Sequence, residues 1–263
     1  MRGSGFPNGR YGAHPAQVGD LRVPGGDPPW PVAVLLHGGF WRARYDRGLM
    51  DALAEDLVAA GWASWNLEYR RLGDGGGWPA TFVDVAAGID HLRELANGVA
   101  LDLTTVVAIG HSAGGHLALW AASRPSLPRG SPGAAPGVRV SGVVAQAAVA
   151  SPREAARLGL SGAAAAELLG GSPEHVPERW NVASPSEHLP FSVPQLLVHG
   201  LADELVPVEL SRAHAAAATE AGDEVELVVL RGVGHFEHLD PGSEAWAVVR
   251  RWLAAIRRRL DGR

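Results

Sequence analysis

The segment V-V-A-I-G-H-S-A-G-G at residues 106–115 decides the fold, because it contains Gly110-His111-Ser112-Ala113-Gly114 directly after an apolar run. A helical pattern follows over residues 116–122. G-x-S-x-G between a strand and a helix predicts a sharp turn that raises the serine hydroxyl above the edge of a sheet. The simpler alternative is a glycine-rich turn with an incidental serine. The residues that follow the other predicted strands distinguish a nucleophilic serine from an incidental one.

Short apolar runs alternate with helical patterns along the chain. Continuous apolar strands alternating with amphipathic helices predict a mostly parallel sheet covered on both faces, in one α/β domain over residues 1–263. A less regular run, Gln17–Val23, predicts an antiparallel edge strand. The expected parallel strands are Val32–Leu36, Ala63–Leu67, Val106–Ile109, Val138–Ala145, Gln195–Val198 and Glu226–Leu230.

Two segments interrupt this alternation. Ser123–Gly137 is rich in Pro, Gly and Ser and predicts a surface loop. Ser151–Pro190 contains short helical pieces, Glu154–Leu158 and Ala163–Leu169, separated by Gly and Pro. Residues 151–190 are therefore expected to form a small cap or lid over the carboxyl edge of the sheet, within the same domain.

Candidate partners for the serine follow the last two strands. A serine hydroxyl needs a base near neutral pH, and a histidine base needs a carboxylate to orient it. Asp203 follows the strand Gln195–Val198, and His235 follows Glu226–Leu230 in the glycine-rich run G-V-G-H-F. Both loops leave carboxyl ends of parallel strands, so we expect Ser112, Asp203 and His235 to meet at one edge. Glu204 and His238 are the alternatives for the acid and the base.

A second glycine-rich loop, His37-Gly38-Gly39-Phe40-Trp41, follows the strand Val32–Leu36. Two glycines there allow main-chain N–H groups to face the site, and a tetrahedral intermediate needs such donors. The backbone N–H groups of Gly39, Phe40 and Ala113 are the expected oxyanion hole. The alternative is that Gly38 and Gly39 form only a tight turn.

Composition narrows the chemistry further. The 263 residues include no cysteine and no lysine, which excludes thiol nucleophiles, disulfides and Schiff-base chemistry. A net charge of −5 with dispersed arginines argues against a nucleic-acid partner. The apolar runs are too short to cross a membrane, and Met1–Arg10 lacks the apolar core of a signal peptide. A cytoplasmic protein without metal or cofactor is expected.

Together, the H-G-G-F-W loop, the G-H-S-A-G turn, the Asp203 loop and the His235 loop resemble α/β-hydrolases with an HGG-type oxyanion loop. Within them the chain looks most like serine-type kynurenine formamidases (arylformamidases) and related carboxylesterases. H-G-G-x-W and the early Tyr11-Gly12 carry that finer likeness. The resemblance implies acyl transfer on a small-molecule ester or amide, here N-formylkynurenine. Trp41, Trp78 and the segment Ser151–Pro190 are candidate walls of its pocket, and the alternative for the two tryptophans is core or surface packing.

Three other interpretations stay open at this point. A short-chain carboxylesterase of broad specificity would use the same residues. A catalytically silent relative could bind a ligand in the same pocket. A metal hydrolase could be built on His235 and His238, although no H-E-x-x-H motif is present.

Overall fold

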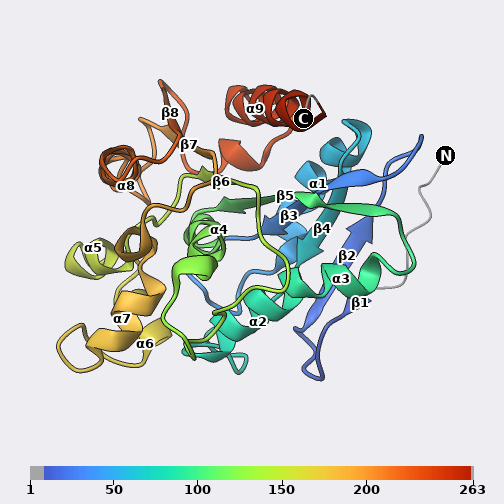
Figure 1. Cartoon of the computed structure of the whole chain (residues 1–263). Coiled ribbons are helices and arrows are strands. Elements are labelled where there is room, and N and C mark those ends of the chain that lie inside the picture. The colour runs from blue at the N-terminus through green and yellow to red at the C-terminus, as the bar shows by residue number, and fades with distance from the viewer. Residues whose placement is uncertain (1–8, 262–263) are drawn as a thin grey trace.

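Strands and helices alternate around one twisted sheet in the computed structural model, which describes residues 9–261 (Figure 1). Within that range the sheet has eight strands in the order β1-β2-β4-β3-β5-β6-β7-β8. Strands β3 to β8 run parallel, and β1 and β2 form an antiparallel edge beside β4. The strands are β1 (Gly9–Arg10), β2 (Val18–Arg22), β3 (Trp30–Leu36), β4 (Ala63–Leu67), β5 (Leu101–His111), β6 (Gly142–Gln146), β7 (Gln195–Gly200) and β8 (Val225–Leu230).

The predicted strands are all present, and the α/β-hydrolase fold is confirmed, but two strand starts differ from the expectation: β5 begins at Leu101, five residues before Val106, and β6 begins late. The run Val138–Ala145 was expected to be extended throughout, whereas β6 begins only at Gly142. Before that point Val138 donates its backbone N–H to the Asp90 carboxylate at 2.9 Å. This contact directs the chain toward the end of a helix, so the ladder with β5 starts at the pair Val107–Gly142.

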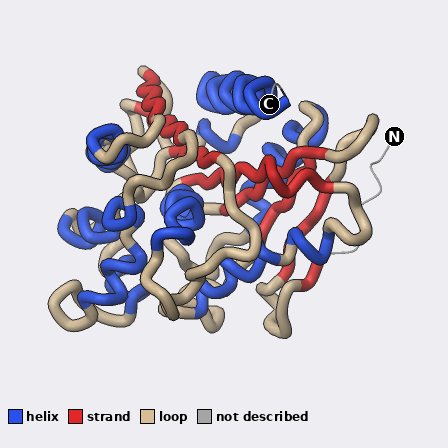
Figure 2. Tube along the Cα trace, in the orientation of Figure 1, coloured by secondary structure: helices blue, strands red, loops and turns tan. Residues whose placement is uncertain are grey.

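Helices cover both faces of the sheet, as Figure 2 shows by secondary structure. Successive side chains of β3 point to opposite faces of the sheet and pack into two separate hydrophobic cores. The first core contains Val32, Val34 and Leu36, and the second contains Ala33 and Leu35. The second core is closed by α1 (Asp51–Ala59) and α9 (Glu244–Asp261). The first is closed by α2 (Ala80–Asp90), α4 (Ala113–Ser123) and α8 (Glu209–Glu220), with the short α3 (Leu92–Leu95) nearby.

Between β6 and β7 the chain forms short helices, as the composition of residues 151–190 predicts. These are α5 (Pro152–Arg157), α6 (Ala164–Leu169), α7 (Pro177–Ala183) and a 3₁₀ turn (Pro185–His188). The first begins with Ser151, whose hydroxyl accepts the Glu154 N–H at 3.2 Å, followed by Pro152 at the first helical position. They gather beside α4, on the side of the sheet that carries the first core (Figure 1).

Among the helices of residues 9–261, each is either too short or too polar to span a lipid bilayer.

Candidate active site

The turn after β5 forces Ser112 into a strained conformation. Its φ is 56° and its ψ is −119°, values that L-residues rarely adopt. The glycines on either side are required by crowding: a Cβ at Gly110 would overlap the carbonyl of Gly114, and a Cβ at Gly114 would overlap the carbonyl of Leu36. The Ser112 N–H is bound to the Gln146 carbonyl at 2.8 Å. The serine is therefore held by backbone contacts at the junction of three strands.

Asp203 and His235 come together as the sequence predicts. The His235 Nδ1 donates to the Asp203 Oδ2 at 2.7 Å, and the Asp203 side chain is fully buried. The other carboxylate oxygen accepts the N–H groups of Leu205 and Val206, both at 2.9 Å. Since Nδ1 is engaged, Nε2 is the nitrogen of His235 that can accept a proton.

A second histidine completes the surroundings of this carboxylate. His199 lies with its Nε2 3.3 Å from the Asp203 Oδ2 and 2.9 Å from the Val206 carbonyl, and its Nδ1 meets the Ser211 hydroxyl. Burial opposes ionisation of Asp203, but the hydrogen bonds from His199 and His235 outweigh it and hold its pKa far below the ordinary range. The carboxylate stays charged and able to orient the histidine.

The two alternatives are placed differently. Glu204 points to solvent, and His238 is fully buried with neither ring nitrogen bonded to a described residue. Burial, followed by the charge of nearby histidines, lowers the pKa of His238 to about 3. A catalytic base needs a carboxylate that orients its ring and stabilises its charged form, and the His238 ring contacts none. The geometry therefore favours Asp203 as the acid and His235 as the base.

The histidine loop is tied to the serine turn through His111, the residue preceding Ser112. The His111 Nε2 meets the His235 carbonyl oxygen at 2.8 Å, and the two rings lie 4.6 Å apart between centroids. His111 is buried, and burial lowers its pKa well below the ordinary value. This contact brings the loops after β5 and β8 side by side at the carboxyl edge of the sheet.

The loop after β3 lies against the same serine. A Cβ built on Gly38 would sit 3.0 Å from the Ser112 Cβ, which shows how closely the two turns approach. Gly39, Phe40 and Trp41 have consecutive positive φ angles of 105°, 48° and 57°. Two of these are non-glycine residues in a costly conformation, of the kind that persists where its surroundings enforce it.

This loop and the start of α4 leave main-chain donors free. Among residues 9–261, no main-chain or side-chain acceptor lies within hydrogen-bond distance and angle of the N–H groups of Gly39, Phe40 and Ala113. Free N–H groups beside a serine hydroxyl are what an oxyanion hole requires.

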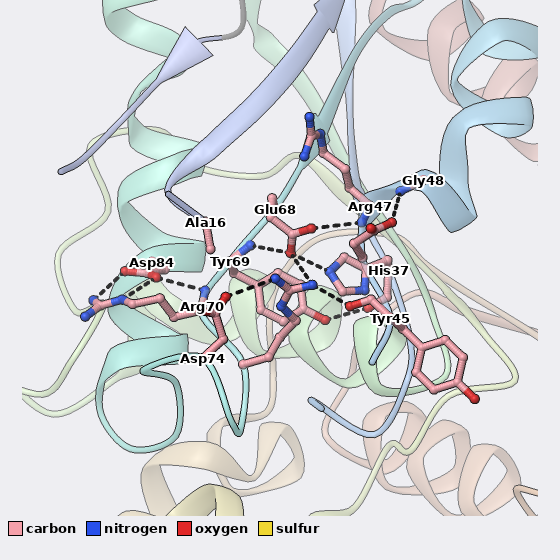
Figure 3. A network of polar contacts seen from close by, with 12 residues as sticks. Ala16, His37, Tyr45, Arg47, Gly48, Glu68, Tyr69, Arg70, Asp74 and Asp84 are labelled. Atoms are coloured by element: carbon pink, nitrogen blue, oxygen red, sulfur yellow. Dashed lines mark hydrogen bonds and ion pairs between the residues drawn. The ribbon is translucent and has the colours of Figure 1, made fainter. Parts of the chain in front are cut away.

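Behind the loop lies a buried polar network that the motifs in the sequence do not predict (Figure 3). Its centre is Glu68, which lies one residue beyond β4. The Glu68 Oε1 lies 2.9 Å from the His37 Nε2 and 3.4 Å from a terminal nitrogen of Arg71. Tyr69 stacks on the His37 ring at 4.5 Å, and its hydroxyl donates to the His37 carbonyl at 2.7 Å. Tyr11 donates to the Glu68 carbonyl at 2.6 Å. The signal for this network is the polar run Glu68-Tyr69-Arg70-Arg71 directly after an apolar strand.

The two tryptophans proposed for the pocket occupy different environments. Trp41 is 1% exposed and meets the His116 ring edge-on at 5.3 Å. Trp78 is half-buried, packs on Phe82, and donates its backbone N–H to the Leu168 carbonyl of α6 at 2.6 Å. Their contribution to substrate binding stays a prediction.

No group of three or more His, Asp or Glu side chains within residues 9–261 is arranged to hold a metal ion.

A parallel sheet, a strained serine after a central strand, and an Asp–His pair at the neighbouring strand ends together define the α/β-hydrolase class. Comparison with known proteins places the chain more narrowly. The BD-FAE family model matches residues 20–217, three quarters of the chain, so the protein belongs to the BD-FAE family.

Curated relatives are mycobacterial. Esterase LipQ of Mycobacterium tuberculosis is 29% identical over 202 residues, covering 73% of this chain and 46% of the relative. Esterase LipC of the same organism is 28% identical over 244 residues, covering 88% of this chain and 59% of the relative. The chain thus spans about half the length of the curated relatives it matches.

Solved structures share the fold over almost the whole chain. A truncated carbohydrate esterase from gut microbiota superposes with a TM-score of 0.84 at 20% identity, covering 96% of this chain and 95% of that one. An inhibited esterase B from Lactobacillus rhamnosis gives 0.82 at 21% identity, with coverages of 98% and 88%. At these identities the likeness concerns the fold.

Proposed function

We propose that this protein is a serine esterase that hydrolyses small carboxylic esters through an acyl-enzyme. Ser112 is the nucleophile, His235 the general base and acid, and Asp203 the group that orients the histidine. The single observation that carries the proposal is the 2.7 Å bond between His235 Nδ1 and the buried Asp203, in a loop tied to the residue before Ser112. The names of the mycobacterial relatives support the same class of reaction.

The proposed reaction has two steps. His235 Nε2 takes the proton of the Ser112 hydroxyl as the oxygen attacks the ester carbonyl, and the imidazolium that forms is stabilised by Asp203. The former carbonyl oxygen of the tetrahedral intermediate carries the negative charge, and the free N–H groups of Gly39, Phe40 and Ala113 donate hydrogen bonds to it. The histidine then protonates the leaving alcohol, and a water molecule, activated by the same ring, releases the acid.

The decisive experiment is hydrolysis of p-nitrophenyl acetate by the wild type and by Ser112→Ala. Activity and labelling by a fluorophosphonate should both disappear in the variant. A matched control is Ser126→Ala, an exposed serine at the end of the 3₁₀ turn that follows α4, which should keep both. Hydrolysis that persists in Ser112→Ala would remove the proposed nucleophile.

A finer proposal concerns the substrate. The H-G-G-F-W loop and the Tyr11-Gly12 start favour an arylformamidase that cleaves N-formylkynurenine to kynurenine and formate. The fold likeness to a carbohydrate esterase and to an acetyl ester-xyloside bifunctional hydrolase instead suggests acetylated sugars. A panel of N-formylkynurenine, an acetylated xyloside and p-nitrophenyl acetate separates these, since the natural class should have the highest kcat/KM. A preference for the simple ester would leave a broad-specificity carboxylesterase.

A further inference from the structure

The His37 ring faces an oxygen acceptor on each side. Its Nδ1 lies 2.8 Å from the Gly38 carbonyl, and its Nε2 lies 2.9 Å from the Glu68 Oε1. A carbonyl oxygen and an ionised carboxylate can only accept hydrogen bonds, so both ring nitrogens have to donate. A neutral imidazole carries one ring hydrogen, whereas an imidazolium carries two. If both contacts are hydrogen bonds, each ring nitrogen of His37 carries a hydrogen and the ring is charged while Glu68 is ionised.

Glu68 is surrounded by donors that favour its ionised form. Besides His37, its Oε1 accepts the Tyr69 N–H at 3.0 Å, and its Oε2 accepts the Arg47 N–H at 3.0 Å (Figure 3). Burial opposes ionisation, but the His37 hydrogen bond and the charges of His37 and Arg71 outweigh it and lower the pKa of Glu68.

The charges around this carboxylate are balanced. Arg71 is shared with Asp74, which lies 3.2 Å from its other terminal nitrogen, and with the carbonyl of Tyr45. Arg71, which is buried, therefore forms an ion pair with Asp74 near the surface. His37 and Glu68 form a second pair, which is buried. A protonated Glu68 would leave two cations facing a single anion.

The ion pair acts on the oxyanion loop through one peptide group. In a trans peptide the carbonyl and the N–H point in opposite directions, so holding the Gly38 carbonyl also fixes the Gly39 N–H. His37 Nδ1 holds that carbonyl, which turns the Gly39 N–H away from the ring. The preceding peptide is fixed as well, because the Tyr69 hydroxyl binds the His37 carbonyl.

We propose that Glu68 is a positioning residue for catalysis: it keeps His37 as an imidazolium, and His37 holds the Gly39 N–H toward the oxyanion beside Ser112. This rests on the proposed esterase function of the same site. A donor aimed at the developing charge stabilises the transition state more than the bound substrate. Loss of the positioning should therefore lower kcat and leave KM nearly unchanged.

The substitution Glu68→Gln tests the positioning role, because glutamine has almost the same shape as glutamate but no charge. An amide cannot accept from all the donors around it and cannot balance an imidazolium. We expect kcat for p-nitrophenyl acetate to fall on the order of 10²-fold, with KM within about twofold. The matched control is Asp84→Asn, which also removes a fully buried carboxylate, one bound to Arg70 at 2.7 Å but without contact to His37. Its kcat should stay close to that of the wild type.

A spectroscopic readout keeps the proposal testable if Glu68→Gln folds poorly. In the ¹⁵N-labelled wild type at neutral pH, both ring nitrogens of His37 should carry a slowly exchanging hydrogen, assigned by its absence in His37→Gln. A single ring hydrogen would overturn the proposal, and so would a kcat loss in Glu68→Gln no larger than in Asp84→Asn. The hydrogen count does not depend on activity. Survival of hydrolysis in Ser112→Ala would instead remove the proposed function alone.

Discussion

Acid should destabilise this protein well above the pH at which carboxylates titrate, because several histidines are buried in their neutral form. Burial lowers the pKa of His116 and of His214 to about 4, and of His238 to about 3. In the unfolded chain each returns to its ordinary value of 6.5. Between these values the unfolded state binds protons that the folded state does not, so the free energy of unfolding falls as the pH falls.

The size of the effect follows from these values. A histidine whose pKa is 6.5 unfolded and about 4 folded loses about 2 kcal/mol of stabilisation between pH of about 7.5 and about 5. Three such residues lose about 6 kcal/mol together, a large part of the roughly 5–15 kcal/mol that stabilises an ordinary domain. The depressed pKa values of Asp203 and Glu68 act in a lower window, since their contribution is present above the ordinary carboxyl values of 3.8 and 4.5 and is lost as the pH falls below these values.

Urea unfolding followed by tryptophan fluorescence at the two pH values measures this loss. His116→Gln isolates one contribution, because glutamine can still donate to the Ala183 carbonyl that His116 Nε2 contacts at 2.7 Å. Whatever its absolute stability, the variant should lose about 2 kcal/mol less than the wild type between the two pH values. An identical loss in both proteins would refute the assignment of His116 as a buried neutral ring.

Three further substitutions test the activity of the proposed site and the stability of the fold around it. Asp203→Asn should lower kcat about 10⁴-fold in a p-nitrophenyl acetate assay by losing the charge that orients the base, while Glu204→Gln should retain activity. Gly114→Ala should lose more than about 2 kcal/mol in urea unfolding, because the new Cβ overlaps main-chain carbonyls, whereas Gly25→Ala, which meets open space, should change by less than about 0.5 kcal/mol. Arg42→Ala removes a half-exposed ion pair with α6 and should cost less than about 1 kcal/mol in the same assay.

The fold and the order of the site residues could be predicted because both depend on local patterns. Apolar runs mark the parallel strands, and residues that follow their carboxyl ends have to share one edge of the sheet. The geometry brings Asp203 and His235 together for this reason. Crowding around Gly110 and Gly114 is equally local, since a strand-to-helix turn of that sharpness leaves no room for side chains.

What the sequence did not reveal depends on contacts between distant segments. Glu68 meets His37 only because β3 and β4 are neighbours in register, with Leu36 opposite Leu67. The burial of Trp41 likewise comes from packing against α4, which a loop sequence does not disclose. The early start predicted for β6 failed because a single carboxylate, Asp90, captures the preceding backbone.

The way the segment between β6 and β7 is attached suggests where specificity resides. Three of its contacts with the rest of the protein use its own main-chain carbonyls: Ala183 accepts from His116, Val182 from Trp120, and Leu168 from the Trp78 N–H. Every residue type carries a carbonyl, so these contacts place almost no demand on side chains in the segment. The proposed catalytic residues, by contrast, depend on particular glycines, such as Gly110 and Gly114, and on the buried Asp203 carboxylate. Substitutions of side chains in residues 151–190 are therefore expected to leave the contacts between Asp203 and His235 unchanged; if the proposed function holds, such substitutions would alter substrate preference before they alter the acyl-transfer step.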